Sequence, residues 1–182
     1  MKQQAGFTLI ETLIAIFILT LTIGGLLTLA AGGYFSVRYS RNQIVANSLL
    51  QESLEYVRNS RDTLFQQNGD WNQWLAGFSD CFTTAGCAID PYTRGTHVVP
   101  AAGQPIIFYP TFGFYGYAGG SYPSIVTSGT APYLTTYVRT VTMKKSDTDP
   151  NQVIVNATVA WLNGSTQKTA TQSILITNWN GR

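Results

Sequence analysis

The sequence predicts an α+β protein in which one long N-terminal helix packs on a C-terminal antiparallel β-sheet. An unbroken apolar run near the amino terminus, a following segment with helically spaced apolar residues, and three alternating segments at the carboxyl end together predict this fold. The expected boundaries are a short polar segment over 1–6, a transmembrane helix over 7–37, its amphipathic continuation over 38–61, an irregular region over 62–132 and the sheet over 133–182.

The apolar run extends from Phe7 to Val37 and contains one charged residue, Glu11. At about 1.5 Å per residue, the uncharged stretch from Thr12 to Val37 is longer than the roughly 30 Å hydrocarbon core of a bilayer. A core helix of a small soluble domain does not need this length. The run therefore predicts one membrane-spanning helix.

Glu11 helps to distinguish a cleaved signal peptide, an ordinary membrane anchor and a membrane helix with a further function. A secretory signal peptide would be cut after the apolar run, near Ala31, and would leave Glu11 without a role. A carboxylate in the first turns of a membrane helix costs several kcal/mol unless it is paired or reaches the interface, so it indicates function. An ordinary anchor with Glu11 in the headgroup region is the remaining alternative.

The segment AGFTLIETLIAIFIL resembles the amino terminus of type IV prepilins and of the related pseudopilins. The shared pattern is a short leader with a basic residue, a Gly directly before Phe, an apolar run, and a Glu at the fifth place from that Phe. The resemblance implies a pilin-like fold, cleavage by a prepilin peptidase between Gly6 and Phe7, and N-methylation of Phe7. It also implies that Glu11 pairs with the Phe7 amine of a neighbouring subunit during assembly.

The resemblance further implies a structural role and a set of partners. These are other pilin subunits, the prepilin peptidase and the pilus assembly platform, with the chain first in the cytoplasmic membrane as a single-pass protein and then in a pilus at the cell surface. The segment from Ala46 to Asp62 is more similar to minor pilins and pilus-modification proteins than to major pilins. A pseudopilin of a secretion or DNA-uptake system, a tip adhesin binding through residues 103–133, and an anchored envelope protein remain alternatives.

The basic residues near the span conflict with this orientation. Lys2 is the only one before the apolar run, whereas Arg38 and Arg41 follow it closely. The positive-inside rule alone does not predict a cytoplasmic amino terminus. The resemblance and the β-rich remainder nevertheless favour an extracytoplasmic head.

The amphipathic continuation carries one apolar stripe. Its members recur at helical spacing and face a polar side with charge pairs three and four residues apart. A sheet in the same chain is the simplest partner for such a stripe, and a membrane surface or another protein is the alternative. The predicted stripe consists of Val45, Ala46, Leu49, Leu50, Ser53, Leu54 and Val57.

Cys81 and Cys87 are the two cysteines of the chain and lie six residues apart in a segment rich in turn residues. A disulfide between them suits an extracytoplasmic location, and two free thiols are the alternative. A structural zinc site would need further ligands, and His97 is the single histidine. We therefore expect no metal site.

The carboxyl-terminal third predicts three antiparallel strands, TTYVRTVTMKK, QVIVNATVAWLNG and TATQSILITNW, joined by turn residues. On the second strand, alternation predicts that one face packs against the helix. That face consists of Val153, Val155, Ala157, Val159 and Trp161.

Composition and motifs argue against several functions. Charged residues make up 11% of the chain and the net charge is +2, without the basic cluster expected of a nucleic-acid-binding protein. No nucleophile lies beside a base signature and no phosphate-binding glycine motif precedes a helix, so we expect neither an enzyme nor a cofactor. Asp147 and Asp149 read as turn residues rather than as calcium ligands.

Overall fold

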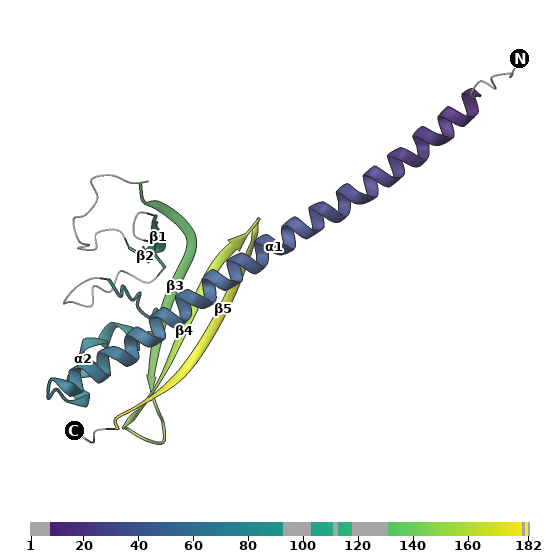
Figure 1. Ribbon diagram of the computed structural model, residues 1–182. Coiled ribbons are helices and arrows are strands. Elements are labelled where there is room, and N and C mark those ends of the chain that lie inside the picture. The colour runs from purple at the N-terminus through teal and green to yellow at the C-terminus, as the bar shows by residue number, and fades with distance from the viewer. Residues whose placement is uncertain (1–7, 93–102, 111–112, 118–130, 180, 182) are drawn as a thin grey trace, which may run out of the picture. The chain divides into compact units, whose positions relative to one another are not determined.

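The computed structural model describes residues 8–92, 103–110, 113–117, 131–179 and 181. The chain divides into two compact units, 1–41 and 42–182. Helix α1 (Leu9–Gln66) contributes its first part to one unit and its second part to the other, which also contains every described strand. The long helix and antiparallel sheet of Figure 1 confirm the predicted α+β class.

Helix α1 ends at Gln66 and not near Arg61 as we expected. The apolar periodicity continues past Arg61, because Phe65 is buried among core side chains. Asn68 then adopts a positive φ of 63°, and the Gly69 amide donates to the Leu64 carbonyl at 2.8 Å. A Cβ on residue 69 would overlap the Leu64 side chain, so glycine suits this helix end.

The five strands form one antiparallel sheet with the order β2-β1-β3-β4-β5. β4 and β5 pair along their whole length from Gln152↔Thr177 to Asn163↔Thr166, and the hairpin between them turns at Gly164, whose φ is +65°. A positive φ is what a two-residue hairpin loop requires. The strands are β1 (Pro105–Tyr109), β2 (Phe114–Gly116), β3 (Tyr133–Lys145), β4 (Gln152–Asn163) and β5 (Thr166–Thr177).

The region expected to be irregular, 62–132, contains regular structure where it is described. Two short helices follow α1, namely α2 (Trp71–Gly77) and the 3-10 helix η1 (Ser79–Phe82), and strands β1 and β2 add an edge to the sheet. Asp70 caps α2 by accepting a hydrogen bond from the Gln73 amide at 2.8 Å. These helices are short, and strong turn residues surround them, so periodicity alone did not reveal them.

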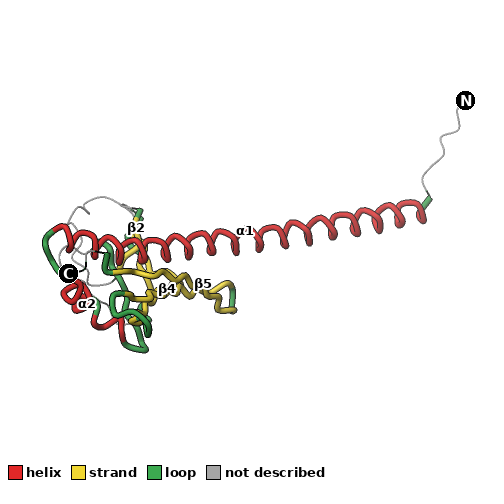
Figure 2. The backbone as a smooth tube through the Cα atoms, turned by 90° about the horizontal axis from the view of Figure 1, so that it is seen from below, coloured by secondary structure: helices red, strands yellow, loops and turns green. Residues whose placement is uncertain are grey.

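The core side chains come from the second part of α1 and from one face of the sheet, and Figure 2 shows this part of the helix running alongside the strands. Every residue of the predicted α1 stripe is buried except Val45, which is partly buried against the core. All five residues predicted for the helix-facing side of β4 are also buried. Both faces follow from the periods of a helix and of a strand, and both predictions are confirmed.

We expect Leu50→Ala to lower the free energy of unfolding by about 2–5 kcal/mol, because truncating a buried leucine leaves a cavity. Ile44→Ala, on an exposed turn of the same helix, should change it by less than about 0.5 kcal/mol. Urea unfolding of the full chain in detergent micelles, followed by tryptophan fluorescence, measures both. Equal effects of the two substitutions would contradict the packing of α1 on the sheet.

Candidate functional site

The predicted processing and assembly residues fall at the amino terminus of the chain. Gly6 and Phe7 lie outside the described residues, so their predicted roles are untested. Glu11 lies in the first turn of α1, where its amide donates to the Thr8 carbonyl at 3.1 Å. A carboxylate at this end of a helix interacts favourably with the helix dipole.

Glu11 is exposed and makes no ion pair with another described residue. All large apolar side chains around it, from Leu9 to Ile18, are exposed by more than half. An unpaired carboxylate within an apolar surface is stable only where water, a headgroup or a cation reaches it. This position fits a residue whose partner comes from another molecule.

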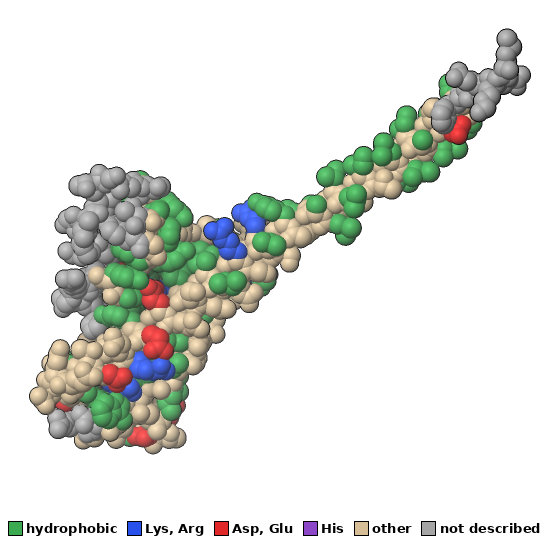
Figure 3. All heavy atoms as spheres, in the orientation of Figure 1, with side chains coloured by type: hydrophobic (Ala, Val, Ile, Leu, Met, Phe, Trp, Pro, Cys, Tyr) green, Lys and Arg blue, Asp and Glu red, His purple; other side chains and the backbone are tan. Residues whose placement is uncertain are grey.

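The apolar part of α1 has a surface that no described residue covers. Figure 3 shows hydrophobic side chains over the visible face of this segment, with few charged ones among them. The helix is long and apolar enough to cross a membrane, with a mean hydropathy of 2.5 in its most apolar window and none of that window buried. A surface apolar on all sides belongs in lipid or against other apolar helices.

The threonines of this segment are already hydrogen-bonded within α1. Thr12, Thr20 and Thr22 each donate to the carbonyl three residues earlier, and Thr28 donates to the carbonyl of Gly24, at 2.8–2.9 Å. Hydroxyl groups bonded in this way carry a small penalty in hydrocarbon. The segment therefore presents an apolar surface despite its threonine content.

In the second unit, the sequence expectation of a disulfide is confirmed, because Cys81 and Cys87 are joined. Both cysteines are fully buried, and Cys87 exchanges two backbone hydrogen bonds of 2.8 Å with Val141 on β3. The bridge thus joins η1 to Cys87, and the two hydrogen bonds join Cys87 to the sheet. Gly86 comes so close to the Val141 carbonyl that a Cβ would lie 2.6 Å from its oxygen.

Arg139 on β3 is a buried cation that the sequence analysis missed. Its side chain is fully buried and pairs with Glu52 of α1 at 2.6 Å. It also donates to the Leu49 carbonyl at 3.1 Å and to the Ile89 carbonyl. One guanidinium therefore joins α1, β3 and the loop that follows the disulfide.

Tyr117 completes the surroundings of this cation. The Arg139 guanidinium carbon lies 5.9 Å from the centroid of its ring. Burial would lower the pKa of Arg139, but Tyr117 and Glu52 outweigh it and raise the pKa above its ordinary value. Burial also raises the pKa of the Tyr117 hydroxyl, against the opposing effect of Arg139. Arginine and tyrosine thus stay in their usual protonation states throughout the physiological range.

The sequence did carry a signal for Arg139. In the alternating segment YVRTVTM, the arginine occupies the same phase as Tyr137, Val141 and Met143, all three of which are buried. A charged residue in the buried phase of a strand needs a partner. The identity of that partner is a matter of tertiary packing.

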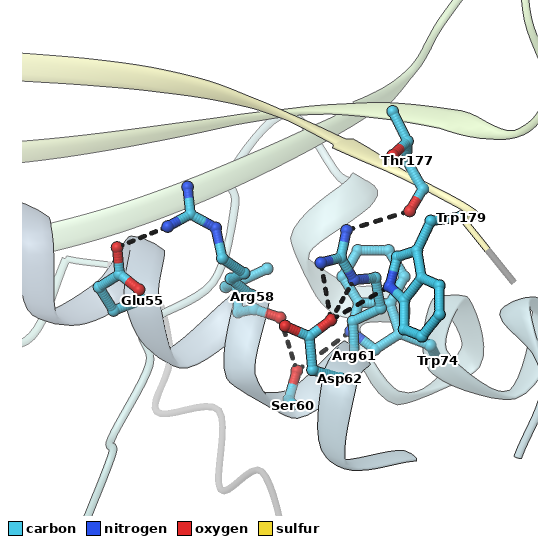
Figure 4. A network of polar contacts seen from close by, with 9 residues as sticks. Glu55, Arg58, Ser60, Arg61, Asp62, Trp74, Thr177 and Trp179 are labelled. Carbon is cyan, nitrogen blue, oxygen red and sulfur yellow. Dashed lines mark hydrogen bonds and ion pairs between the residues drawn. The ribbon is translucent and has the colours of Figure 1, made fainter. Parts of the chain in front are cut away.

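A second polar network fastens the end of α1 (Figure 4). Arg61 contacts Asp62 at 2.7 Å and donates to the Thr177 carbonyl at the end of β5 at 3.0 Å. Trp179 donates to the same Asp62 carboxylate at 3.3 Å, and Trp74 of α2 donates to Ser60 at 3.0 Å. The network joins the last turns of α1 to α2 and to the carboxyl-terminal strand.

An open groove of about 530 Å³ lies between α1 and Pro91. Its carboxylates are already paired, since Glu52 contacts Arg139, Glu55 contacts Arg58 at 2.7 Å, and Asp62 contacts Arg61. No group of three or more metal-ligating side chains occurs among the described residues. The groove therefore offers no preformed cation site.

The Asp147–Asp149 turn is held by its own hydrogen bonds. Lys144 contacts Asp147 at 2.7 Å, and Asp149 accepts from Asn151 and Gln152 at 2.8 Å. These contacts fit the turn that the sequence predicted. His97 lies outside the described residues.

The aromatic region 103–133 is described only in part. Tyr92, Phe114 and Tyr109 stack with centroid distances of 4.3 and 4.9 Å, and Phe108 contacts both Tyr115 and Tyr133. Most of these rings therefore pack on one another. An adhesive role for this region stays a prediction.

Comparison with known families supports the reading of the amino terminus. Residues 1–31 match the family model of the prokaryotic N-terminal methylation motif. No curated protein and no solved structure matches the chain. The chain therefore carries the N-terminal motif of the type IV prepilin and pseudopilin family, whose members are processed by prepilin peptidase and assemble into pilus-type structures, and the comparison does not determine the type of subunit.

The ion pair between Arg139 and Glu52 yields a prediction for the stability of the second unit, residues 42–182, which is called the head below. Glu52→Gln should destabilise the protein by about 3–5 kcal/mol, because it leaves the Arg139 charge buried and uncompensated. Adding Arg139→Met should recover part of this loss, which a double-mutant cycle by urea unfolding detects as a coupling energy. Glu55→Gln, which breaks an exposed pair, should cost less than about 1 kcal/mol. Additive effects of the Glu52 and Arg139 substitutions would contradict the pairing.

Proposed function

We propose that this type IV pilin-like chain is a minor structural subunit of a type IV pilus, cut between Gly6 and Phe7 and assembled through α1. The observation that supports it is the combination of the N-terminal methylation motif with an apolar helix that the chain leaves uncovered. Before assembly, lipid covers this surface. After assembly, equivalent helices of other subunits cover it.

Glu11 supplies the register in this proposal. Cleavage after Gly6 creates a positive amine on Phe7, four residues before Glu11. Among apolar helices each of these charges is costly alone, whereas a pair between neighbouring subunits removes most of the cost. Pairing the amine of one subunit with Glu11 of the next fixes their relative position along the filament.

The head is the part of the subunit that the filament displays. It is held by a disulfide, a buried ion pair and a continuous core, so it keeps its structure without help from neighbours. The similarity of residues 46–62 to minor pilins supports the minor role over the major one. A pseudopilin has the same architecture and differs in the machine it joins.

Processing is tested by expressing the precursor with a prepilin peptidase and determining the mature amino terminus by mass spectrometry. We expect an N-methylated Phe7 in the wild type and in Gly33→Ala, and an uncut chain in Gly6→Val, because the peptidase recognises the glycine before the scissile bond. An intact Met1 in the wild type, or a cut near Ala31, would refute the proposal.

Assembly is tested by Glu11→Gln, with Glu55→Gln as the matched substitution outside the apolar run. The Glu11 variant should be processed and inserted normally but should enter sheared surface pili at least about tenfold less, because glutamine cannot neutralise the buried amine. The Glu55 variant should assemble like the wild type. A processed wild-type chain that is absent from pili and required for protein secretion would instead identify a pseudopilin.

A further inference from the structure

The segment of α1 that follows the apolar run carries two arginines without ion-pair partners. Arg38 and Arg41 are both exposed and are three residues apart, so they share one side of the helix. All nine Asp and Glu residues of the chain lie in its described part, and none forms an ion pair with either arginine. Their charges are available to another molecule.

Aromatic side chains flank these arginines. Tyr34, one turn before Arg38 on the same side of the helix, is 59% exposed, and the Arg38 guanidinium carbon lies 5.6 Å from its ring centroid. The neighbouring Phe35 is 66% exposed. Exposed tyrosine and arginine directly after an apolar helix are typical of the boundary between hydrocarbon and headgroups.

We propose that Tyr34, Arg38 and Arg41 form a binding site for the phosphate groups of anionic phospholipids at the carboxyl end of the span. A guanidinium matches a phosphodiester in charge and offers it two parallel donors, which an ammonium cannot do. The apolar surface that ends at Val37 takes up the acyl chains of the same lipid. Charge and apolar surface are therefore contiguous on one helix, as they are in a phospholipid.

This site fixes how deep α1 lies in the bilayer. The apolar run exceeds the thickness of the hydrocarbon, so the helix has more than one position in which it spans. With Arg38 among the phosphates, the hydrocarbon covers roughly residues 18–37, and Glu11 lies about 10 Å beyond its other boundary. Glu11 is then hydrated among headgroups before assembly.

The positive-inside rule does not favour Arg38 and Arg41 at the extracytoplasmic interface, so their presence there calls for a role of their own. Arginines that hold lipid phosphates at the opposite interface contribute to retention in the membrane. The inference deepens the proposed function, since it describes how the subunit is held in the membrane before assembly.

Lipid selectivity tests the site directly. The full precursor is reconstituted in phosphatidylcholine vesicles with a trace of spin-labelled phosphatidylglycerol or phosphatidylcholine, and the fraction of motionally restricted label is measured. For the wild type we expect the restricted fraction of phosphatidylglycerol to correspond to an affinity about fivefold or more above that for phosphatidylcholine. For Arg38→Gln/Arg41→Gln we expect the ratio of the two affinities to be near one. Lys145→Gln/Lys168→Gln removes the same charge from exposed positions in the head and should leave the preference unchanged.

Two results would overturn the proposal: a wild type that shows no preference for the anionic lipid, or an arginine variant that keeps the full preference. Formation of the Cys81–Cys87 disulfide in each variant shows that the head has folded. The assay does not involve cleavage. A precursor that prefers the anionic lipid but is not cut by prepilin peptidase would therefore refute the proposed function and support this inference. A precursor that is cut but shows no lipid preference would support the proposed function and refute this inference.

The depth of α1 provides a second, independent measurement. Thr20→Cys and Thr28→Cys, each carrying a nitroxide, are compared for accessibility to oxygen and to a water-soluble nickel complex. Because the native cysteines are bonded to each other, only the new one is labelled. We expect residue 28 to be the deeper of the two. A deeper residue 20 would put the middle of the span before residue 24, so that Arg38 would lie at least about 7 Å outside the hydrocarbon. That result would overturn the placement of Arg38 at the hydrocarbon boundary.

Discussion

The uncovered apolar surface of α1 is the constraint on which the rest of this protein depends. Its large apolar side chains between Leu9 and Val37 are exposed, and such a surface belongs in lipid or against other apolar helices. The same helix then carries a one-sided stripe, buried by the sheet, from Ala46 to Val57. One helix therefore has two environments, and in the proposed assembly other subunits replace lipid around its first part.

The head has to remain folded while that exchange takes place. Apolar burial joins α1 to the sheet, and polar contacts between separate elements add to it. Arg139 connects β3 to α1 and to the loop after the disulfide, and Arg61 connects α1 to β5. Such contacts specify one arrangement, since a buried guanidinium tolerates few alternatives.

Charge is used sparingly, and its placement is informative. Glu11 lies near one end of the apolar run and the Arg38–Arg41 pair lies at the other. Neither set forms an ion pair with another described residue, whereas most carboxylates of residues 42–182 are paired or accept hydrogen bonds in turns and caps. For both sets we propose a partner in another molecule.

The sequence by itself determined the apolar span, the processing motif, the stripe on α1 and the buried face of β4, because each is a local pattern with the period of one element. The tertiary structure decided that Glu52 pairs with Arg139, that Cys87 lies beside Val141, and that β1 and β2 extend the sheet beyond β3. These contacts join residues far apart in the chain. Local periodicity carries no information about such partners, since packing between elements selects them.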